Sequence, residues 1–197
     1  MSSNAVPWAQ ILIPALAALT GVLIGGLITS HNQKKERQHR RMREQLEGFY
    51  SVLLGMRLQI LAKSELREKL RGIAEDAWKK ELEPALGDTQ AKERINSALW
   101  PQYEKLFHYD ERQLEQEIIP LYRDMLAHMT KCMGLAEPST VKHYGTLVEY
   151  VEIWNRALQK TLPTQVKIRL QHEEAKLFPF YEDLGAQAQR LREQLKK

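Results

Sequence analysis

The sequence predicts an all-α protein in which one N-terminal transmembrane helix is followed by a cytoplasmic bundle of about five or six helices. Three observations predict it: an uncharged apolar segment from Ala5 to Ser30, a basic run directly after it, and apolar residues spaced three and four apart over the rest. No stretch alternates with the period of two that a sheet requires. The predicted parts are a short external tail (1–7), the transmembrane helix (8–30), a basic juxtamembrane helix (31–45) and the helical bundle domain (46–197).

The transmembrane prediction rests on the length and polarity of the N-terminal segment. Ile11 to Ile28 is almost unbroken apolar sequence, and about 20 such residues cross the roughly 30 Å hydrocarbon layer. Each Leu, Ile or Val favours insertion by about 0.3 to 0.6 kcal/mol, whereas a central charge would cost about 2.5 to 3.5 kcal/mol. A cleaved signal peptide would carry its positive charges before a shorter apolar run. A buried core helix would usually be shorter, so we favour a retained anchor.

The orientation follows from the basic residues beside the anchor. Residues 1–33 contain no Lys or Arg, so the positive-inside rule places the N-terminus outside and the rest of the chain in the cytoplasm. Basic groups next to an anionic leaflet each contribute about 1 kcal/mol of attraction. A plain stop-transfer flank is the simpler interpretation of the same run. The residues predicted to contact the membrane surface are Lys34, Lys35, Arg37, Arg40, Arg41 and Arg43.

Small residues line one face of the predicted transmembrane helix. Ala17, Gly21 and Gly25 recur every four positions, so a second helix backbone could approach closely along that face. Self-association into a homo-oligomer is one interpretation of this face. The other is a helix that meets only lipid.

The charge balance of the chain depends on where the basic residues lie. The 29 basic and 25 acidic residues give a formal net charge of +4, but residues 34–43 hold six basic residues against Glu36. The remaining 23 basic and 24 acidic residues provide no positive field for phosphates, which argues against nucleic-acid binding. The single cysteine, Cys132, excludes an intramolecular disulfide and agrees with a reducing compartment.

The first part of the bundle domain predicts two amphipathic stretches. One apolar stripe runs from Met42 to Leu61 and is interrupted only by Arg57, for which a buried carboxylate and a lipid phosphate are both open as partners. The stripe restarts after Ser64 and ends before Pro84 and Gly87.

The later helices are predicted from caps, prolines and further apolar stripes. Asp88 or Thr89 caps a helix that Pro101 breaks or kinks, and a short piece then follows. The other predicted elements are the piece Tyr103–Phe107, a capping box at Asp110 before a helix that is kinked at Pro120 and stopped by Gly134, a helix from Val141 to Leu158, and a coiled-coil-like segment from Val166 to Leu195 that is interrupted by Glu173 and kinked at Pro179.

One short region carries a resemblance to known proteins. The string Phe49-Tyr50-Ser51-Val52-Leu53-Leu54-Gly55-Met56-Arg57, followed by Ala62-Lys63-Ser64-Glu65-Leu66-Arg67, resembles uncharacterised bacterial proteins that have one N-terminal span and a helical cytoplasmic body. The resemblance covers about the first third of the chain. It implies the bacterial inner (plasma) membrane and no particular chemistry.

Candidate chemical groups are few. Asp124, His128 and Cys132 follow one another at four-residue steps, but the apolar stripe around Met125 and Met129 turns Cys132 toward the core and Asp124 toward water. A metal site is therefore not expected there. No nucleophile elbow, Walker lysine or dinucleotide-binding glycine motif occurs, so we expect no cofactor and consider an enzyme the less favoured class.

The function that the sequence favours is interaction at a membrane. We expect a membrane-anchored protein that tethers or regulates a protein partner at the cytoplasmic face, in contact with membrane lipids. A phage-related or envelope-stress component acting within the membrane is a second class, and an enzyme with a site inside the bundle is a third.

Overall fold

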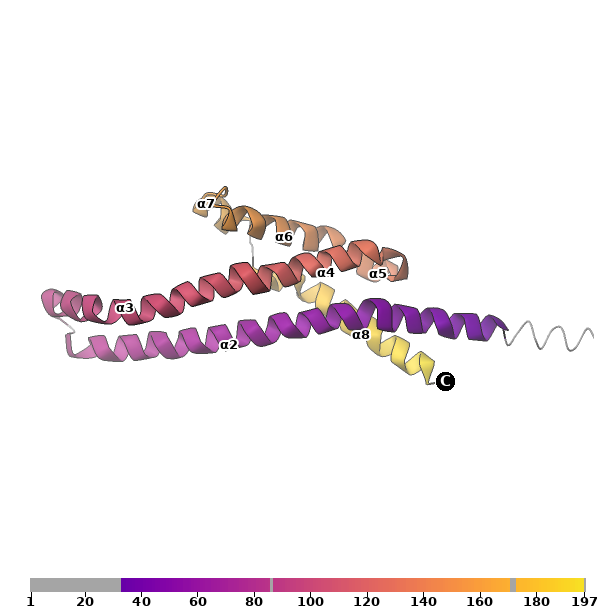
Figure 1. Ribbon diagram of the computed structural model, residues 1–197, viewed down its shortest axis with the longest axis horizontal. Coiled ribbons are helices and arrows are strands. Elements are labelled where there is room, and N and C mark those ends of the chain that lie inside the picture. Colours follow the sequence, from indigo (N-terminus) through magenta and orange to yellow (C-terminus); the bar gives the residue numbers. More distant parts are fainter. Residues whose placement is uncertain (1–32, 86, 171–172, 197) are drawn as a thin grey trace, which may run out of the picture. The chain divides into compact units, whose positions relative to one another are not determined.

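The computed structural model describes residues 33–85, 87–170 and 173–196, and all of its regular elements in these ranges are helical (Figure 1). The predicted all-α class is therefore confirmed. The chain divides into two compact units, Met1–Glu44 and Gln45–Lys197. In the first unit, residues 33–44 are helical.

The predicted transmembrane helix, residues 8–30, lies outside the described residues, and so does its small-residue face of Ala17, Gly21 and Gly25. In the part of the chain that is described, no helix combines the length and the apolar character that crossing a bilayer requires.

The longest element of the second unit is α2 (Ser51–Leu82), which follows the π-helical turn η1 (Leu46–Tyr50). The helix continues without a break through Ser64, after which the apolar pattern restarts in the sequence. Serine in a helix costs well under 1 kcal/mol relative to alanine, and neither Pro nor Gly occurs between Met56 and Arg71 to stop it.

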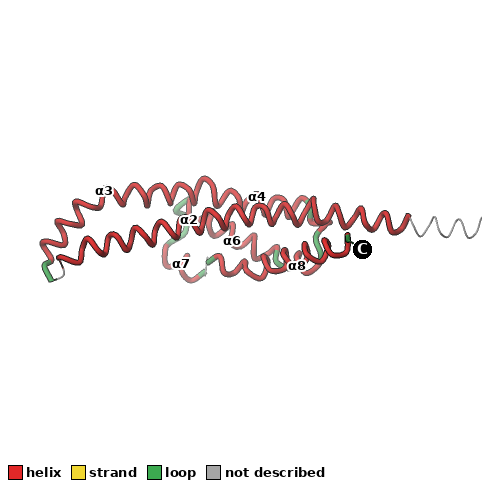
Figure 2. The backbone as a smooth tube through the Cα atoms, turned by 90° about the horizontal axis from the view of Figure 1, so that it is seen from below, coloured by secondary structure: helices red, strands yellow, loops and turns green. Residues whose placement is uncertain are grey.

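A tight connection reverses the chain after α2. Gly87 has a φ of 102°, which glycine adopts without strain. The carboxylate of Asp88 then accepts hydrogen bonds from the amides of Gln90 and Ala91 at 3.0 and 3.1 Å. This confirms the predicted N-cap and starts α3 (Thr89–Gln113), which runs back along α2 as an antiparallel hairpin (Figures 1 and 2).

Helix α3 continues through two positions at which the sequence predicted a boundary. Pro101 lies inside α3, so the piece Tyr103–Phe107 is not a separate helix. Pro101 is exposed, and water can therefore hydrate the carbonyl that a proline leaves without its amide partner. Asp110 is likewise inside α3, so the predicted capping box there is wrong.

The chain continues from α3 through a second π-helical turn, η3 (Leu114–Ile118), into α4 (Ile119–Lys131). Pro120 lies in the first turn of α4, where its missing amide would have no intrahelical partner. The helix ends before the turn η4 (Met133–Leu135), as the predicted stop at Gly134 requires.

The last helices fold back over the base of the hairpin. They are α5 (Pro138–Val141), α6 (Tyr144–Leu158), α7 (Thr164–Arg169), η5 (Glu174–Leu177) and α8 (Phe178–Leu195). In the predicted coiled-coil-like segment from Val166 to Leu195, which Glu173 interrupts, the described residues form two separate helices, α7 and α8, with η5 directly before α8. Pro179 instead occupies the first turn of α8, a position that suits proline.

The hydrophobic core lies at the base of the hairpin, where α2, α4, α6 and α8 meet. Its fully buried side chains are Phe49, Tyr50, Leu53, Ile60, Ile119, Tyr122, Met125, Met129, Leu147, Leu177, Phe180 and Leu184. The outer half of the hairpin, residues 62–110, is here named the arm. Among the described residues of the arm, only Ala74 and Ala85 are buried, so this two-helix extension exposes much apolar surface.

Candidate functional site

The candidate site is a groove on one side of the arm, between α2 and α3. Its volume is about 300 Å³, which is at the lower end of the range for ligand pockets. We name it the aromatic groove, and its lining residues are Ala74, Glu75, Trp78, Lys79, Trp100, Tyr103 and Phe107.

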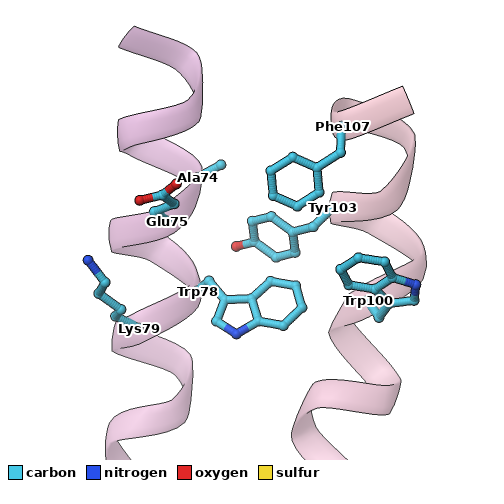
Figure 3. Close-up of a pocket in the computed structure, with 7 residues that line it drawn as sticks. All are labelled: Ala74, Glu75, Trp78, Lys79, Trp100, Tyr103 and Phe107. Atoms are coloured by element: carbon cyan, nitrogen blue, oxygen red, sulfur yellow. The ribbon is translucent and has the colours of Figure 1, made fainter. Parts of the chain in front are cut away.

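The aromatic rings of the groove pack against one another across the two helices (Figure 3). The ring centre of Trp78 lies 4.7 Å from that of Tyr103 and 5.9 Å from that of Trp100, both edge to face. The rings of Trp100 and Phe107 are 6.2 Å apart. Such pairs contribute about 0.5 to 1.5 kcal/mol each beyond the area they bury. They hold the arm together while leaving Trp100 about half exposed.

Charged and polar groups lie at the edges of the aromatic groove. Lys79 projects from α2 away from α3 (Figure 3), and Glu75 forms an ion pair of 3.0 Å with Arg71 one turn earlier. At the outer end, the Oδ1 atom of Asn96 is buried and accepts no hydrogen bond from the described part of the chain. Asn96 lines a neighbouring hollow with Trp78 and Trp100 and is not part of the groove wall, which is mainly apolar.

Asp110 lies close to the seam between the two arm helices. Partial burial raises the pKa of its carboxyl above the ordinary value, and the guanidinium groups of Arg67 and Arg71 act in the opposite direction. This carboxylate belongs to the polar middle of the hairpin, between the core and the aromatic groove.

The aromatic groove continues a stripe of α2 that is covered at the base of the hairpin. Leu53 and Ile60 are fully buried there, and Arg57 of the same stripe contacts Tyr181 of α8 and Glu174 of η5. Steps of three and four residues lead from Ile60 to Ala74 and Trp78. The groove therefore lies, on the arm, on the side of α2 from which Arg57 contacts η5 and α8 at the base.

Arg57 is the centre of a polar cluster at that base. Its Nη1 lies 3.1 Å from Oε1 of Glu174, and its guanidinium carbon is 4.0 Å from the centre of the Tyr181 ring. The Tyr181 hydroxyl is 3.3 Å from that of Tyr122 and 3.4 Å from Glu174. Arg57, the one residue that interrupts the predicted apolar stripe, is thus paired with a carboxylate and an aromatic ring.

Burial controls the ionisation of the tyrosines in this region. It raises the pKa of Tyr150 to about 12 and raises the pKa values of Tyr122 and Tyr181 above the ordinary value for tyrosine. Their hydroxyls therefore remain neutral hydrogen-bonding groups. The three tyrosines, with Arg57 and Glu174, form a polar network that belongs to the structure of the core.

The predicted membrane-surface residues lie on the helical residues 33–44 of the first unit. All six, Lys34, Lys35, Arg37, Arg40, Arg41 and Arg43, are exposed. Arg40 forms a long, exposed ion pair of 3.8 Å with Glu36, which leaves its charge accessible. Their contact with lipid stays a prediction.

The structure does not bring Asp124, His128 and Cys132 together as a site. Asp124 is exposed, Cys132 is half-buried, and Nε2 of His128 lies 2.9 Å from the carbonyl oxygen of Gly48. The His128 ring also stacks on Phe49. Within the described ranges, no group of three His, Cys, Asp or Glu side chains is arranged to hold a metal ion.

The aromatic groove was not among the predicted sites. Trp78 belonged to a predicted stripe, and the spacing of Trp100, Tyr103 and Phe107 by three and four residues was a signal that these rings share one face of a helix. Because the sequence predicted that Pro101 breaks or kinks the helix, Trp100 was not grouped with Tyr103 and Phe107. No protein-family model, curated protein or solved structure matches this chain.

Proposed function

We propose that this protein is a membrane-anchored interaction protein whose aromatic groove binds an amphipathic helix of a partner protein at the cytoplasmic face of the bacterial inner membrane. The observation that carries the proposal is the aromatic groove itself. It is an apolar channel between two helices, in line with a surface that already receives helical segments of the same chain.

The choice of a helix as occupant rests on the continuity of α2. At the base, Leu53 and Ile60 are fully buried, and Arg57 on the same stripe contacts Glu174 of η5 and Tyr181 of α8. On the arm, Ala74 and Trp78 extend that stripe without a covering helix among the described residues. Apolar side chains spaced i and i+4 on a partner helix would enter such a groove, which is an established mode of peptide recognition.

The anchoring part of the proposal rests on the sequence. Residues 5–30 carry no charge and are followed by six basic residues within ten positions, the pattern of a single span with its C-terminal side in the cytoplasm. The exposure of these six side chains on residues 33–44 suits contact with anionic lipid headgroups.

The lining of the groove is suited to binding and contains few groups that could take part in a reaction. Of its seven lining residues, only Glu75 and Lys79 carry charge, and Glu75 is paired with Arg71. Aromatic residues, by contrast, supply much of the binding energy at protein interfaces.

Site-specific photo-crosslinking in native membranes tests the binding part of the proposal. A photoreactive amino acid at Lys79, beside the groove, should give one adduct whose partner peptide is an amphipathic helical segment. The same probe at Gln189 on α8 should give none. Trp100→Ala should abolish the adduct, whereas Tyr109→Ala should not, because Tyr109 is an equally exposed α3 aromatic half a helical turn further around.

Two results would contradict the proposal. The groove would be excluded as the binding site if the probes at Lys79 and Gln189 gave equal amounts of adduct. It would also be excluded if Trp100→Ala left the amount of adduct unchanged. An active alkaline phosphatase fused to the C-terminus, or release of the full chain by carbonate washing, would exclude the proposed anchor and its orientation.

A further inference from the structure

The side of the arm opposite the aromatic groove carries a second apolar surface. On α2, Leu66, Leu70, Ile73 and Ala77 follow one another at steps of four, three and four residues, so they form one stripe. Leu66 and Ile73 are more than half exposed and Leu70 is 43% exposed. This stripe lies roughly a quarter turn from Ala74, the residue that is buried against α3.

The neighbouring helix extends this surface. Ile95, Leu99 and Leu106 of α3 are half-buried and lie on the same side of the antiparallel hairpin. The seven residues Leu66, Leu70, Ile73, Ala77, Ile95, Leu99 and Leu106 are named the apolar arm face. Two adjacent helices with one open apolar face resemble half of a four-helix bundle.

We propose that the occupant of the apolar arm face is the same face of a second copy, with the two arms parallel and related by a two-fold axis along their length. In that arrangement each α2 packs against α3 of the other copy, and all neighbouring helices of the four-helix bundle are antiparallel.

The size of the face suits this occupant. Residues 62–83 measure roughly 32 Å along the helix, and two adjacent helices are roughly 20 Å wide. The face would therefore bury roughly 600 Å² per copy, or roughly 1,200 Å² in total, which reaches the lower limit for stable, specific interfaces. The arm has nine basic and ten acidic residues, so no large net charge opposes pairing.

The charges at the two edges of the face select the parallel arrangement. The outer edge of α3 carries only basic charges, from the exposed residues Arg94, Lys105 and Arg112. The outer edge of α2 is mixed: Asp76 and, directly after the helix, Glu83 are acidic, whereas Lys69 and Lys80 are basic. The pairs Trp78–Tyr103 and Lys63–Glu117 fix the level of the two helices. Asp76 is consequently level with Lys105, and Glu83 is within about one helical turn of Arg94.

The two-fold axis preserves these levels, so Asp76 of one copy meets Lys105 of the other. If the arms were antiparallel instead, α2 would face α2 and α3 would face α3. The basic edges of the two α3 helices would then meet each other, which is unfavourable.

Chemical cross-linking of the full chain in its membrane tests the proposal. With Cys132→Ser as background, copies carrying Asp76→Cys are mixed with copies carrying Lys105→Cys and treated with a short bifunctional thiol reagent. We expect a dimer between the two kinds of copy. Lys79→Cys, on the groove side, serves as the matched control and should give none.

Two further variants measure the interface by sedimentation in detergent. Ile73→Glu should raise the dimer dissociation constant by about thirtyfold or more, with the far-UV circular dichroism unchanged. Lys105→Asp should raise it about tenfold, and Asp76→Lys in the same chain should recover most of the loss. The adduct formed at the aromatic groove should survive Ile73→Glu, so the dimer and the proposed function can fail separately.

Three results would overturn the proposal. The first is a full chain that stays monomeric at a concentration of about 100 μM, far above a typical specific Kd. The second is a dimer dissociation constant that Ile73→Glu leaves unchanged. The third is preferential cross-linking of Asp76→Cys to the same residue of another copy, which would show antiparallel arms.

Discussion

The guanidinium of Arg57 lies over the ring of Tyr181, with its carbon 4.0 Å from the ring centre. The same guanidinium forms an ion pair of 3.1 Å with Glu174, and the Arg57 side chain is only 15% exposed. Of the two partners that the sequence left open for Arg57, the structure therefore shows the carboxylate. This cluster joins the N-terminal part of α2 to η5 and the start of α8.

Replacing Arg57 should destabilise the fold more than replacing an exposed arginine. Arg57→Met removes the cation and leaves Glu174 largely buried without it, so the free energy of unfolding should fall by about 3 kcal/mol. Adding Glu174→Leu should recover most of that loss, because an apolar pair can replace a buried ion pair. Urea unfolding followed by near-UV circular dichroism measures both.

Arg156→Met provides the control for this experiment. Arg156 pairs with Glu152 at 2.7 Å, but both side chains are more than half exposed. The expected loss is about 0.3 to 0.5 kcal/mol. Equal losses for Arg57→Met and Arg156→Met would show that the Arg57 cluster contributes no special stability.

The helical stripes were predictable because burial in this protein follows the period of the α-helix. Leu147 and Val151 of α6, and Leu184, Ala188 and Leu191 of α8, are buried as their spacing predicts. The Asp88 cap was predictable because its carboxylate acts on amides two and three residues away. Local rules suffice where the interaction is local.

The errors came from prolines and from long-range pairing. Pro101 breaks no helix here, since contacts such as Trp78–Tyr103 hold α3 against α2 on both sides of it. Such contacts join residues that are 25 positions apart, and a single sequence gives no direct sign of them. The aromatic groove depends on that pairing, so it could be recognised only once the hairpin was known.

The arm should open locally far more often than the base of the hairpin. Its described residues bury little beyond Ala74 and Ala85, and local stability follows buried apolar contact. Trp78→Ala removes the ring that joins both arm helices and should accelerate amide exchange in the arm about tenfold or more. Hydrogen exchange with mass spectrometry should show α4 and α8 unchanged. Uniform acceleration in all helices would instead show that the arm and the base unfold as one unit.

A buried hydroxyl network should contribute measurable stability near the start of α8. Thr140 is fully buried, its Oγ1 donates to Asp183, and it lies 3.0 Å from the hydroxyl of Tyr50. Thr140→Val keeps the shape but leaves two polar groups without this partner, so unfolding should become easier by about 1 to 3 kcal/mol. Urea titration provides the measurement.

The exposed Thr130 is the matched control for that substitution. Its hydroxyl bonds to Leu126 and Tyr144 at the surface, where water can replace both. Thr130→Val should therefore change the stability by less than about 0.5 kcal/mol. If Thr140→Val changed the free energy of unfolding as little as Thr130→Val does, the network would contribute nothing to folding.

Alkaline pH should weaken the fold through Tyr150. Burial raises the pKa of this tyrosine from 10.0 to about 12 in the folded state, so the folded protein holds the phenolic proton more tightly than the unfolded chain does. The resulting stability is present in full below pH 10 and is lost progressively as the pH rises from 10 to 12, to a total of about 2 to 3 kcal/mol. Urea midpoints at pH 8, 9, 10 and 11 should remain level and then fall. Tyr150→Phe removes this ionisation, so its midpoint should fall less between pH 10 and 11 than that of the parent chain. Parallel curves for the two proteins would show that Tyr150 is not held neutral by the fold.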